Sequence, residues 1–268
     1  MYRDITEGCK GLLVTTAKVL ETTGLSYVIA GGWVPLLVEP NHPTLTHPGT
    51  RDVDVLMVDL ERAKDAVQGL LENGFKPSAK HEFQLLREAL VRNRTFVFNV
   101  DLMHPFEECK GEDMYSDIFD LNIEEIFDTG RLRYVKSIAF PVANVVHERQ
   151  LYSNVRVESL DFCGDNCEIE IPILSPEACL LSKCESCGNK KRTRDAFDIY
   201  YMLTSDNVNT YREKLLNLSR DNQLVFKQME ILKSFLLDKG EVFDRNVAMY
   251  TKSTGGRAAS HCFEVLFS

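Results

Sequence analysis

The sequence predicts an α+β fold, in which a mixed β-sheet flanked by helices is followed by a mainly helical C-terminal part. Residues 27–58 read as a strand, a Gly-Gly turn, a short helix and a second strand. Residues 82–103 read as an antiparallel hairpin, and the patterns from residue 175 onward are helical. Strands linked by helices and strands linked by a hairpin in one chain indicate a mixed sheet rather than a purely parallel one.

The composition is that of a globular protein with no membrane partner. The 268 residues are 44% hydrophobic and 26% charged, which is enough for a substantial core. The net charge of −9 argues against a chain wrapped broadly in nucleic acid, although a local basic patch is compatible with it. No secretory signal and no run of roughly 18 apolar residues is present, so we expect a cytoplasmic protein.

The elements before the middle of the chain follow from periodicity and turn residues. Apolar residues at helical spacing predict a helix over 5–22, which Gly24 would end. A second helix is expected over 60–71, closed by an Asn-Gly pair. Two strands over 82–89 and 95–103 are joined by a polar turn, and a catalytic domain over residues 1–174 would carry an insertion around 105–150.

The C-terminal lobe, residues 175–268, begins with a clear helix signal. Ser175 is a good N-cap and Pro176 suits the first helical position. A second helix starts near Asp195, and two leucine-rich helices follow over 211–237. We expect an irregular tail from Val242.

The stretch around two glycines and two aspartates carries the chemistry. Gly31 and Gly32 break a buried strand, and paired glycines let a backbone turn sharply and let a ligand approach it closely. On the strand that follows, Asp52 and Asp54 point to one face because side chains alternate. Two neighbouring carboxylates repel each other unless a cation joins them, and Mg²⁺ is the natural hard cation for oxygen ligands.

Gly31-Gly32 followed by Asp52-x-Asp54 resembles the nucleotidyltransferase superfamily related to DNA polymerase beta. The resemblance covers roughly residues 25–205. It implies that the glycines contact the phosphates of a nucleoside triphosphate and that Asp52 and Asp54 hold Mg²⁺. It also implies a third acid on a later strand, for which Asp101 is the best candidate, as a further Mg²⁺ ligand that helps to deprotonate the acceptor.

The Gly-Gly-Trp start and the Thr-Arg-Asp-Val-Asp segment are also similar to the lincosamide nucleotidyltransferases. A helix carrying Lys183, followed by Arg-x-Arg-Asp-x-x-Asp-Ile-Tyr, closely resembles the AbiEii-type nucleotidyltransferases, which include toxins of type IV toxin–antitoxin systems. That resemblance places Lys183 and Asp195 in the active site. Lys183, together with Arg51 or Arg194, would neutralise charge on the leaving pyrophosphate, while Asp198 is a candidate structural partner for an arginine.

The acceptor and the biological role stay open between several readings. The toxin resemblance implies a tRNA 3′ end and a cognate antitoxin as partner. The Gly-Gly-Trp resemblance implies a small hydroxylated acceptor such as an antibiotic. A third reading, a catalytically idle module that binds nucleotide or protein, is disfavoured by the three retained acids.

The cysteines allow two interpretations. Eight are present, and without a signal peptide reduced thiols are expected. Four of them have spacings compatible with a structural Zn²⁺ site, although buried free thiols are the favoured interpretation. These four are Cys163, Cys167, Cys184 and Cys187. The histidines lack ligand spacing, and His47 is read as an ordinary loop residue.

Overall fold

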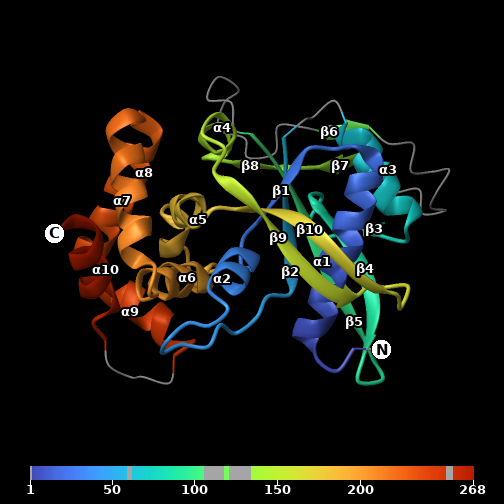
Figure 1. Ribbon diagram of the computed structural model, residues 1–268, viewed down its shortest axis with the longest axis horizontal. Coiled ribbons are helices and arrows are strands. Elements are labelled where there is room, and N and C mark those ends of the chain that lie inside the picture. The colour runs from blue at the N-terminus through green and yellow to red at the C-terminus, as the bar shows by residue number, and fades with distance from the viewer. Residues whose placement is uncertain (1, 59–61, 106–117, 121–133, 252–255) are drawn as a thin grey trace. The chain divides into compact units, whose positions relative to one another are not determined.

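The computed structural model describes residues 2–58, 62–105, 118–120, 134–251 and 256–268 (Figure 1). The chain forms two compact units, which we treat separately. The sheet unit contains Met1–Trp33, Gly49–Glu148 and Tyr152–Ile173. The helical unit contains Val34–Pro48, Arg149–Leu151 and Leu174–Ser268.

The sheet unit is built on a mixed sheet whose strands run in the order β3-β4-β5-β2-β1-β10-β9, with β8 paired to β5. Strand β2 is antiparallel to β1 and parallel to β5, so both strand directions occur at the centre of the sheet. The mixed sheet that the sequence predicts is therefore confirmed. The strands of this sheet are β1 (Tyr27–Ala30), β2 (Asp52–Met57), β3 (Lys76–Pro77), β4 (Gln84–Val91), β5 (Arg94–Pro105), β8 (Ile138–Phe140), β9 (Tyr152–Leu160) and β10 (Asn166–Leu174).

Two helices of the sheet unit form where the sequence predicts them. Helix α1 (Ile5–Thr23) is capped by the Asp4 side chain, which accepts from the Glu7 N–H, and it ends at Gly24 in the left-handed conformation. Helix α3 (Ala63–Glu72) buries its apolar face and packs against α1. Helix α1 also contacts β9, which ties the start of the chain to the β9–β10 hairpin.

The hairpin between β4 and β5 has the tight turn expected from its polar residues. Arg92 and Asn93 both have positive φ, of 48° and 63°, as a two-residue type I′ connection requires. Of the predicted insertion around 105–150, residues 106–117 and 121–133 lie outside the described residues. Its described parts are β8, the two-stranded ladder of β6 (Ile118–Asp120) and β7 (Tyr134–Lys136), and α4 (Ala143–Glu148).

The helical unit is centred on α6 (Thr193–Leu203), whose buried residues include Phe197 and Ile199. Helix α6 packs against α5, α7, α9 and α10. The predicted start of α5 is confirmed, because the Ser175 hydroxyl accepts from the Ala178 N–H and Pro176 opens the helix. The remaining elements are α2 (Trp33–Val38), which begins in the sheet unit, α5 (Pro176–Lys183), the short helix η3 (Ser186–Gly188), α7 (Val208–Asp221), α8 (Gln223–Asp238), α9 (Gly240–Ala248) and α10 (Ala258–Phe267).

The expectation of an irregular tail from Val242 is wrong. Residues Gly240–Ala248 form α9, and Ala258–Phe267 form α10. Phe243 and Val247 are buried on α9, and burial of this apolar face against α6 stabilises a helix that is only nine residues long. Within the described part of the chain, no helix combines the length and the apolar character needed to cross a membrane.

Candidate active site

The turn after β1 brings the backbone against a carboxylate. Gly31 has a φ of 67°, a conformation that side chains disfavour. A Cβ built on Gly31 would lie 1.7 Å from Oδ2 of Asp54, far inside van der Waals contact. Asp54 reaches this place because it lies on β2 opposite Ala30, the last residue of β1. Only glycine therefore fits at position 31 while the Asp54 side chain keeps its place.

The three predicted acids lie on two neighbouring strands. In the parallel pair of β2 and β5, Asp54 is the register partner of Asp101, and Asp52 is that of Asn99. Register partners on adjacent strands project from the same face of a sheet, about 5 Å apart. The fold therefore places the Asp54 and Asp101 side chains next to each other on one face, with Asp52 two residues further along β2.

Neutral donors orient two of these carboxylates. The Thr50 hydroxyl donates to Oδ1 of Asp52 at 2.6 Å, and the Asn99 amide donates to Oδ1 of Asp101 at 2.7 Å. Asp101 is buried, with 9% of its surface exposed. The β2 backbone is fixed as well, since the Trp33 indole N–H donates to the Asp52 carbonyl at 2.9 Å. These bonds limit the carboxylates to few orientations without cancelling their charge.

The donor set fits Mg²⁺ in the way that phosphate-binding sites use it. Among the residues that the structure describes, no three His, Cys, Asp or Glu side chains are grouped closely enough to hold a metal ion by themselves. Mg²⁺ is usually bound through one or two carboxylates together with substrate phosphates, so a protein-only cage is not required. Asp54 and Asp101 supply such a pair of hard oxygen ligands, and Asp52 is available beside them.

A second group of charged side chains lies in the helical unit. The Lys183 ammonium, at the end of α5, is 2.9 Å from Oδ1 of Asp195 and 2.9 Å from Oδ2 of Asp198. Both aspartates are on α6, three residues apart and hence on one face of the helix. The Ser186 hydroxyl donates to the other oxygen of Asp195 at 2.6 Å. The structure thus brings together Lys183 and Asp195, which the resemblance had linked.

Two further side chains complete this buried network. Nε2 of His47 lies 3.1 Å from Oδ1 of Asp198, and Nε of Arg194 lies 3.7 Å from the same oxygen. Asp198 is therefore a partner of Arg194, as the sequence suggested, and of Lys183 and His47, which it did not. The Asp-x-x-Asp spacing on a helix, which places both carboxylates on one face, could have predicted that Lys183 pairs with Asp198 as well as with Asp195. Nothing local signalled His47.

Burial and neighbouring charges shift the pKa of Lys183, Asp198 and His47. Burial alone would lower the pKa of Lys183, but the carboxylates of Asp195 and Asp198 outweigh it and hold that pKa well above its usual range. Burial alone would raise the pKa of Asp198, but Lys183 and His47 hold it below its usual range. Burial lowers the pKa of His47 in spite of Asp198, so the imidazole is neutral and its Nε2–H donates to the carboxylate.

The remaining predicted residues fall into both units. Gly32 is buried in the turn after β1, and Arg51 is exposed just before β2. The cysteine contacts are those of free thiols. The Cys184 and Cys187 thiols are buried and donate to backbone carbonyls at 3.3 Å. Burial raises the pKa of Cys184 and that of Cys187, the latter to about 12.

Known proteins show only distant similarity to this chain. No protein-family model and no curated protein matches the chain. The crystal structure of an antigenic nucleotidyltransferase-like protein from Paracoccidioides brasiliensis is similar over 89% of this chain and 94% of its own, with 14% identity and a TM-score of 0.34. The solution structure of the antibiotic-resistance factor ANT(2'')-Ia is similar over 88% of this chain and 96% of its own, with 12% identity and a TM-score of 0.35. TM-scores this low carry no residue roles across.

Proposed function

We propose that this chain is a metal-assisted nucleotidyltransferase, which moves a nucleoside monophosphate from a nucleoside triphosphate to a hydroxyl acceptor. The observation that carries the proposal is the register of Asp54 with Asp101 on parallel strands, beside a glycine turn that only glycine can make. Adjacent carboxylates attract a hard cation, and a side-chain-free turn lets phosphates approach the backbone. The two features together suit a metal-bound triphosphate.

Each acid has a distinct role in this proposal. Asp54 and Asp52 would hold one Mg²⁺ ion, and Asp101 would hold a second ion and take the proton of the attacking hydroxyl. Mg²⁺, when bound, would neutralise charge on the phosphates and stabilise the entering and leaving oxygens. The acceptor oxygen forms a bond to the α-phosphorus, the bond to the bridging oxygen breaks, and pyrophosphate leaves with that electron pair. The turn at Gly31 and Gly32 would let the phosphates approach the backbone closely.

We propose further that Lys183, with Arg51 or Arg194, neutralises the leaving pyrophosphate, and that Asp195 orients the lysine. The 2.9 Å contact between Lys183 and Asp195 supports the second part. The first part requires that Lys183 exchange a carboxylate partner for phosphate oxygens, because two aspartates already pair with it.

For the acceptor we propose an RNA 3′ end, such as that of a tRNA, and hence a toxin-like role with an antitoxin partner. Support comes from Lys190, Lys191 and Arg192, which are consecutive, basic and exposed directly before α6. A small hydroxylated molecule is the second candidate, favoured by the net charge of −9, which repels a polyanion elsewhere on the surface.

The test is transfer of label from each α-labelled nucleoside triphosphate, with Mg²⁺, in the presence of total tRNA or of small hydroxylated compounds. Asp54→Asn keeps the size of the side chain and removes its charge, so we expect transfer to fall by about 10³-fold or more. Asp65→Asn is the matched control, since Asp65 is an exposed acid of the same unit. Transfer by Asp54→Asn at the wild-type rate would refute the site.

The acceptor is decided in the same experiment. Label in RNA from the wild type establishes the RNA acceptor, and label only in a small compound replaces it with the second candidate. Nucleoside triphosphate binding without transfer to any acceptor would favour the idle module. Loss of transfer in Lys183→Met, with the fold intact, would support the role of the lysine.

A further inference from the structure

The cysteines of the described chain divide sharply by accessibility. Five of them are buried, and burial holds the pKa of three of these thiols, at Cys184, Cys187 and Cys262, above the usual range. The other two are accessible and lie four residues apart at the β9–β10 turn. Cys163 is exposed at the tip of this turn, and Cys167 is half-buried on β10. Thiol chemistry with an external reagent is thus concentrated at one hairpin.

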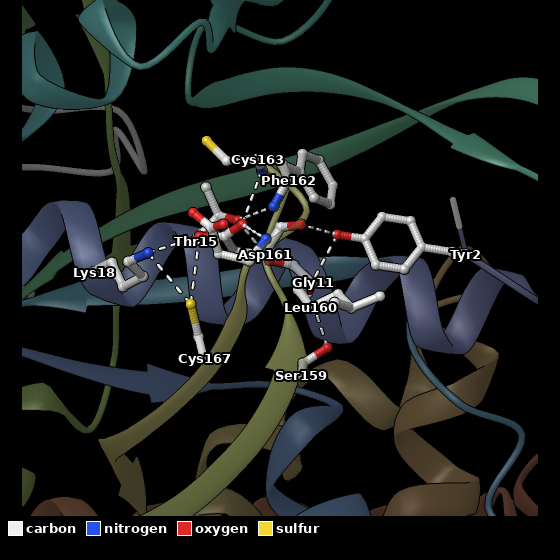
Figure 2. Close-up of polar contacts among 11 residues, drawn as sticks. Tyr2, Gly11, Thr15, Lys18, Ser159, Leu160, Asp161, Phe162, Cys163 and Cys167 are labelled. Carbon is white, nitrogen blue, oxygen red and sulfur yellow. Dashed lines mark hydrogen bonds and ion pairs between the residues drawn. The ribbon is translucent and has the colours of Figure 1, made fainter.

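The environment of Cys167 contains a cation and an anion (Figure 2). The Lys18 ammonium on α1 donates to Sγ of Cys167 at 3.3 Å and to Oδ2 of Asp161 at 2.6 Å. The Cys167 thiol in turn can donate to Oδ2 of Asp161 at 3.4 Å. Lys18 therefore contacts both groups, and its charge stabilises a thiolate at Cys167 whenever the thiol loses its proton.

The positive charge at Lys18 is permanent at neutral pH. The hydrogen bonds to Asp161 and to Cys167 raise the pKa of Lys18 above its usual range. Asp161 is the fixed side of the ion pair, with a side chain that is 3% exposed, whereas 44% of the Lys18 side chain is exposed. A half-exposed ammonium can turn toward a thiolate without breaking the buried part of the structure.

The turn that carries Asp161 is held in place on α1. Oδ1 of Asp161 accepts from the N–H groups of Cys163 and Asp165 at 2.9 and 3.0 Å. The Tyr2 hydroxyl donates to the Asp161 carbonyl at 2.8 Å, and the Thr15 hydroxyl accepts from the next N–H at 2.9 Å. Figure 2 shows these bonds converging on the turn from α1 and the N-terminal residues. The fold thereby holds the turn and Asp161 against α1, within reach of the Lys18 side chain.

The half-buried residue that carries the thiol borders open space. Cys167 lines an open groove of about 870 Å³ between the first turns of α1 and the β9–β10 hairpin, and Lys10 lines the same groove. A space of this volume accommodates a small molecule. No hydrogen bond to Sγ of Cys163 occurs within the described residues, so Cys163 offers an accessible thiol that lacks the cation.

We propose that Cys167 is a modification site for low-molecular-weight disulfides, activated by Lys18 and independent of any nucleotide transfer. The Cys167 proton passes to solvent, and the thiolate sulfur attacks one sulfur of the disulfide. A bond forms between the Cys167 sulfur and that sulfur while the disulfide bond of the reagent breaks. The second sulfur leaves with the electron pair as a thiolate and takes a proton from solvent, so electrons and atoms balance without another oxidant.

The proposal predicts that Cys167 reacts faster than Cys163, whereas accessibility alone predicts the opposite order of rates. Exposure favours Cys163, which is the more open thiol. The adjacent ammonium favours Cys167, and we expect Cys167 to react about five-fold faster at neutral pH. Replacing Lys18 should therefore slow Cys167 and leave Cys163 unchanged.

The experiment measures the reaction of the 268-residue chain with oxidised glutathione and, separately, with uncharged dithiodipyridine. Mass spectrometry of peptides gives the rate at each cysteine, including Cys109. The variants are Lys18→Gln and, as a matched loss of a lysine on the same groove, Lys10→Gln. Because the Lys18 side chain is 44% exposed, its replacement keeps the core intact, which circular dichroism checks.

The expected result is a faster rate at Cys167 than at Cys163 for both reagents, abolished in Lys18→Gln and retained in Lys10→Gln. Asp161→Asn should raise the rate at Cys167, because Lys18 loses its competing anion while Oδ1 can still accept from the turn. Faster reaction at Cys163, or an unchanged Cys167 rate in Lys18→Gln, would overturn the proposal. A fast rate with oxidised glutathione alone would also overturn it, since attraction of an anionic reagent would then explain the rate.

Discussion

Two acids of the sheet unit, Asp52 and Asp101, accept hydrogen bonds from a different kind of donor than Asp195 and Asp198 of the helical unit. In the sheet unit, the Thr50 hydroxyl donates to Asp52 and the Asn99 amide donates to Asp101. In the helical unit, Asp195 and Asp198 share one buried ammonium, that of Lys183.

A neutral donor orients a carboxylate without cancelling its charge, whereas a buried lysine cancels the charge of the carboxylate that it pairs with. Burial and polar contact alone therefore do not identify a reactive acid. We expect metal binding at the acids of the sheet unit, and we expect the buried network of the helical unit to contribute to stability in addition to the role proposed for Lys183.

The largest effect should come from breaking the network. Lys183→Met leaves Asp195 and Asp198 buried without their cation, so the free energy of unfolding should fall by about 3–5 kcal/mol. Urea unfolding measures it. Lys227→Met, which removes an exposed lysine from α8, should change stability by less than about 0.5 kcal/mol. Equal stability of Lys183→Met and the wild type would end the distinction between the two groups of acids.

The glycine turn gives the matching test in the sheet unit. Gly31→Ala introduces a Cβ where Oδ2 of Asp54 lies, and it also strains the backbone, so transfer should be lost and stability should fall by roughly 2 kcal/mol. Gly164→Ala is the control, because Gly164 has a φ of 91° and nothing within 4 Å of an added Cβ. Thermal unfolding and the transfer assay should show strain alone in the control. Transfer by Gly31→Ala at the wild-type rate would show that the activity does not require glycine beside the Asp54 carboxylate.

The ion pair of Lys18 with Asp161 tests whether the sheet unit also contains stabilising charges. Burial alone would raise the pKa of Asp161, but hydrogen bonds from Lys18 and the turn outweigh it and lower that pKa to about 2. A lowered carboxyl pKa stabilises the fold above about pH 4, and that contribution, about 2 kcal/mol, is lost as the pH falls through 2. Unfolding followed from pH 5 to pH 2 should show a shallower loss in Asp161→Asn. If the unfolding free energy depended on pH equally in the wild type and in Asp161→Asn, the ion pair would not contribute to stability.

The smallest effect should come from a neutral cap. Ser175→Ala removes the acceptor for the Ala178 N–H at the start of α5, which should cost about 1 kcal/mol in the free energy of unfolding. Ser175→Asn should restore most of it, because asparagine also caps helices. A loss in the alanine variant as large as that of Lys183→Met would mean that α5, rather than the charge network, controls the stability of the helical unit.

Local chemistry explains what could be predicted from the sequence. The limits of α1, the start of α5 and the β4–β5 turn follow from caps, glycine and turn residues that act within a few positions. The acids of β2 and β5 were found because strand alternation and the family resemblance both point to them. Their pairing in register, Asp54 with Asp101, needed the sheet itself.

The features that could not be predicted from the sequence depend on residues that are distant along the chain. His47 and Asp198 are 151 residues apart, and Lys18 and Cys167 are 149 apart, so no local pattern joins them. The helices α9 and α10 were missed because both are short, α9 opens on Gly240 and α10 follows the Gly255-Gly256 pair, and burial against the rest of the helical unit stabilises them.

The contact of Gly31 with Asp54 ties the identities of two positions 23 residues apart. A chain that acquired any side chain at position 31 would have to shorten or displace the acid at position 54, and a chain that lost the acid would be free to fill the turn. Among descendants of this sequence, glycine at 31 and aspartate at 54 should therefore be kept together or lost together. Substitution at position 31 would then record the loss of the acid, even in a sequence fragment that ends before β2.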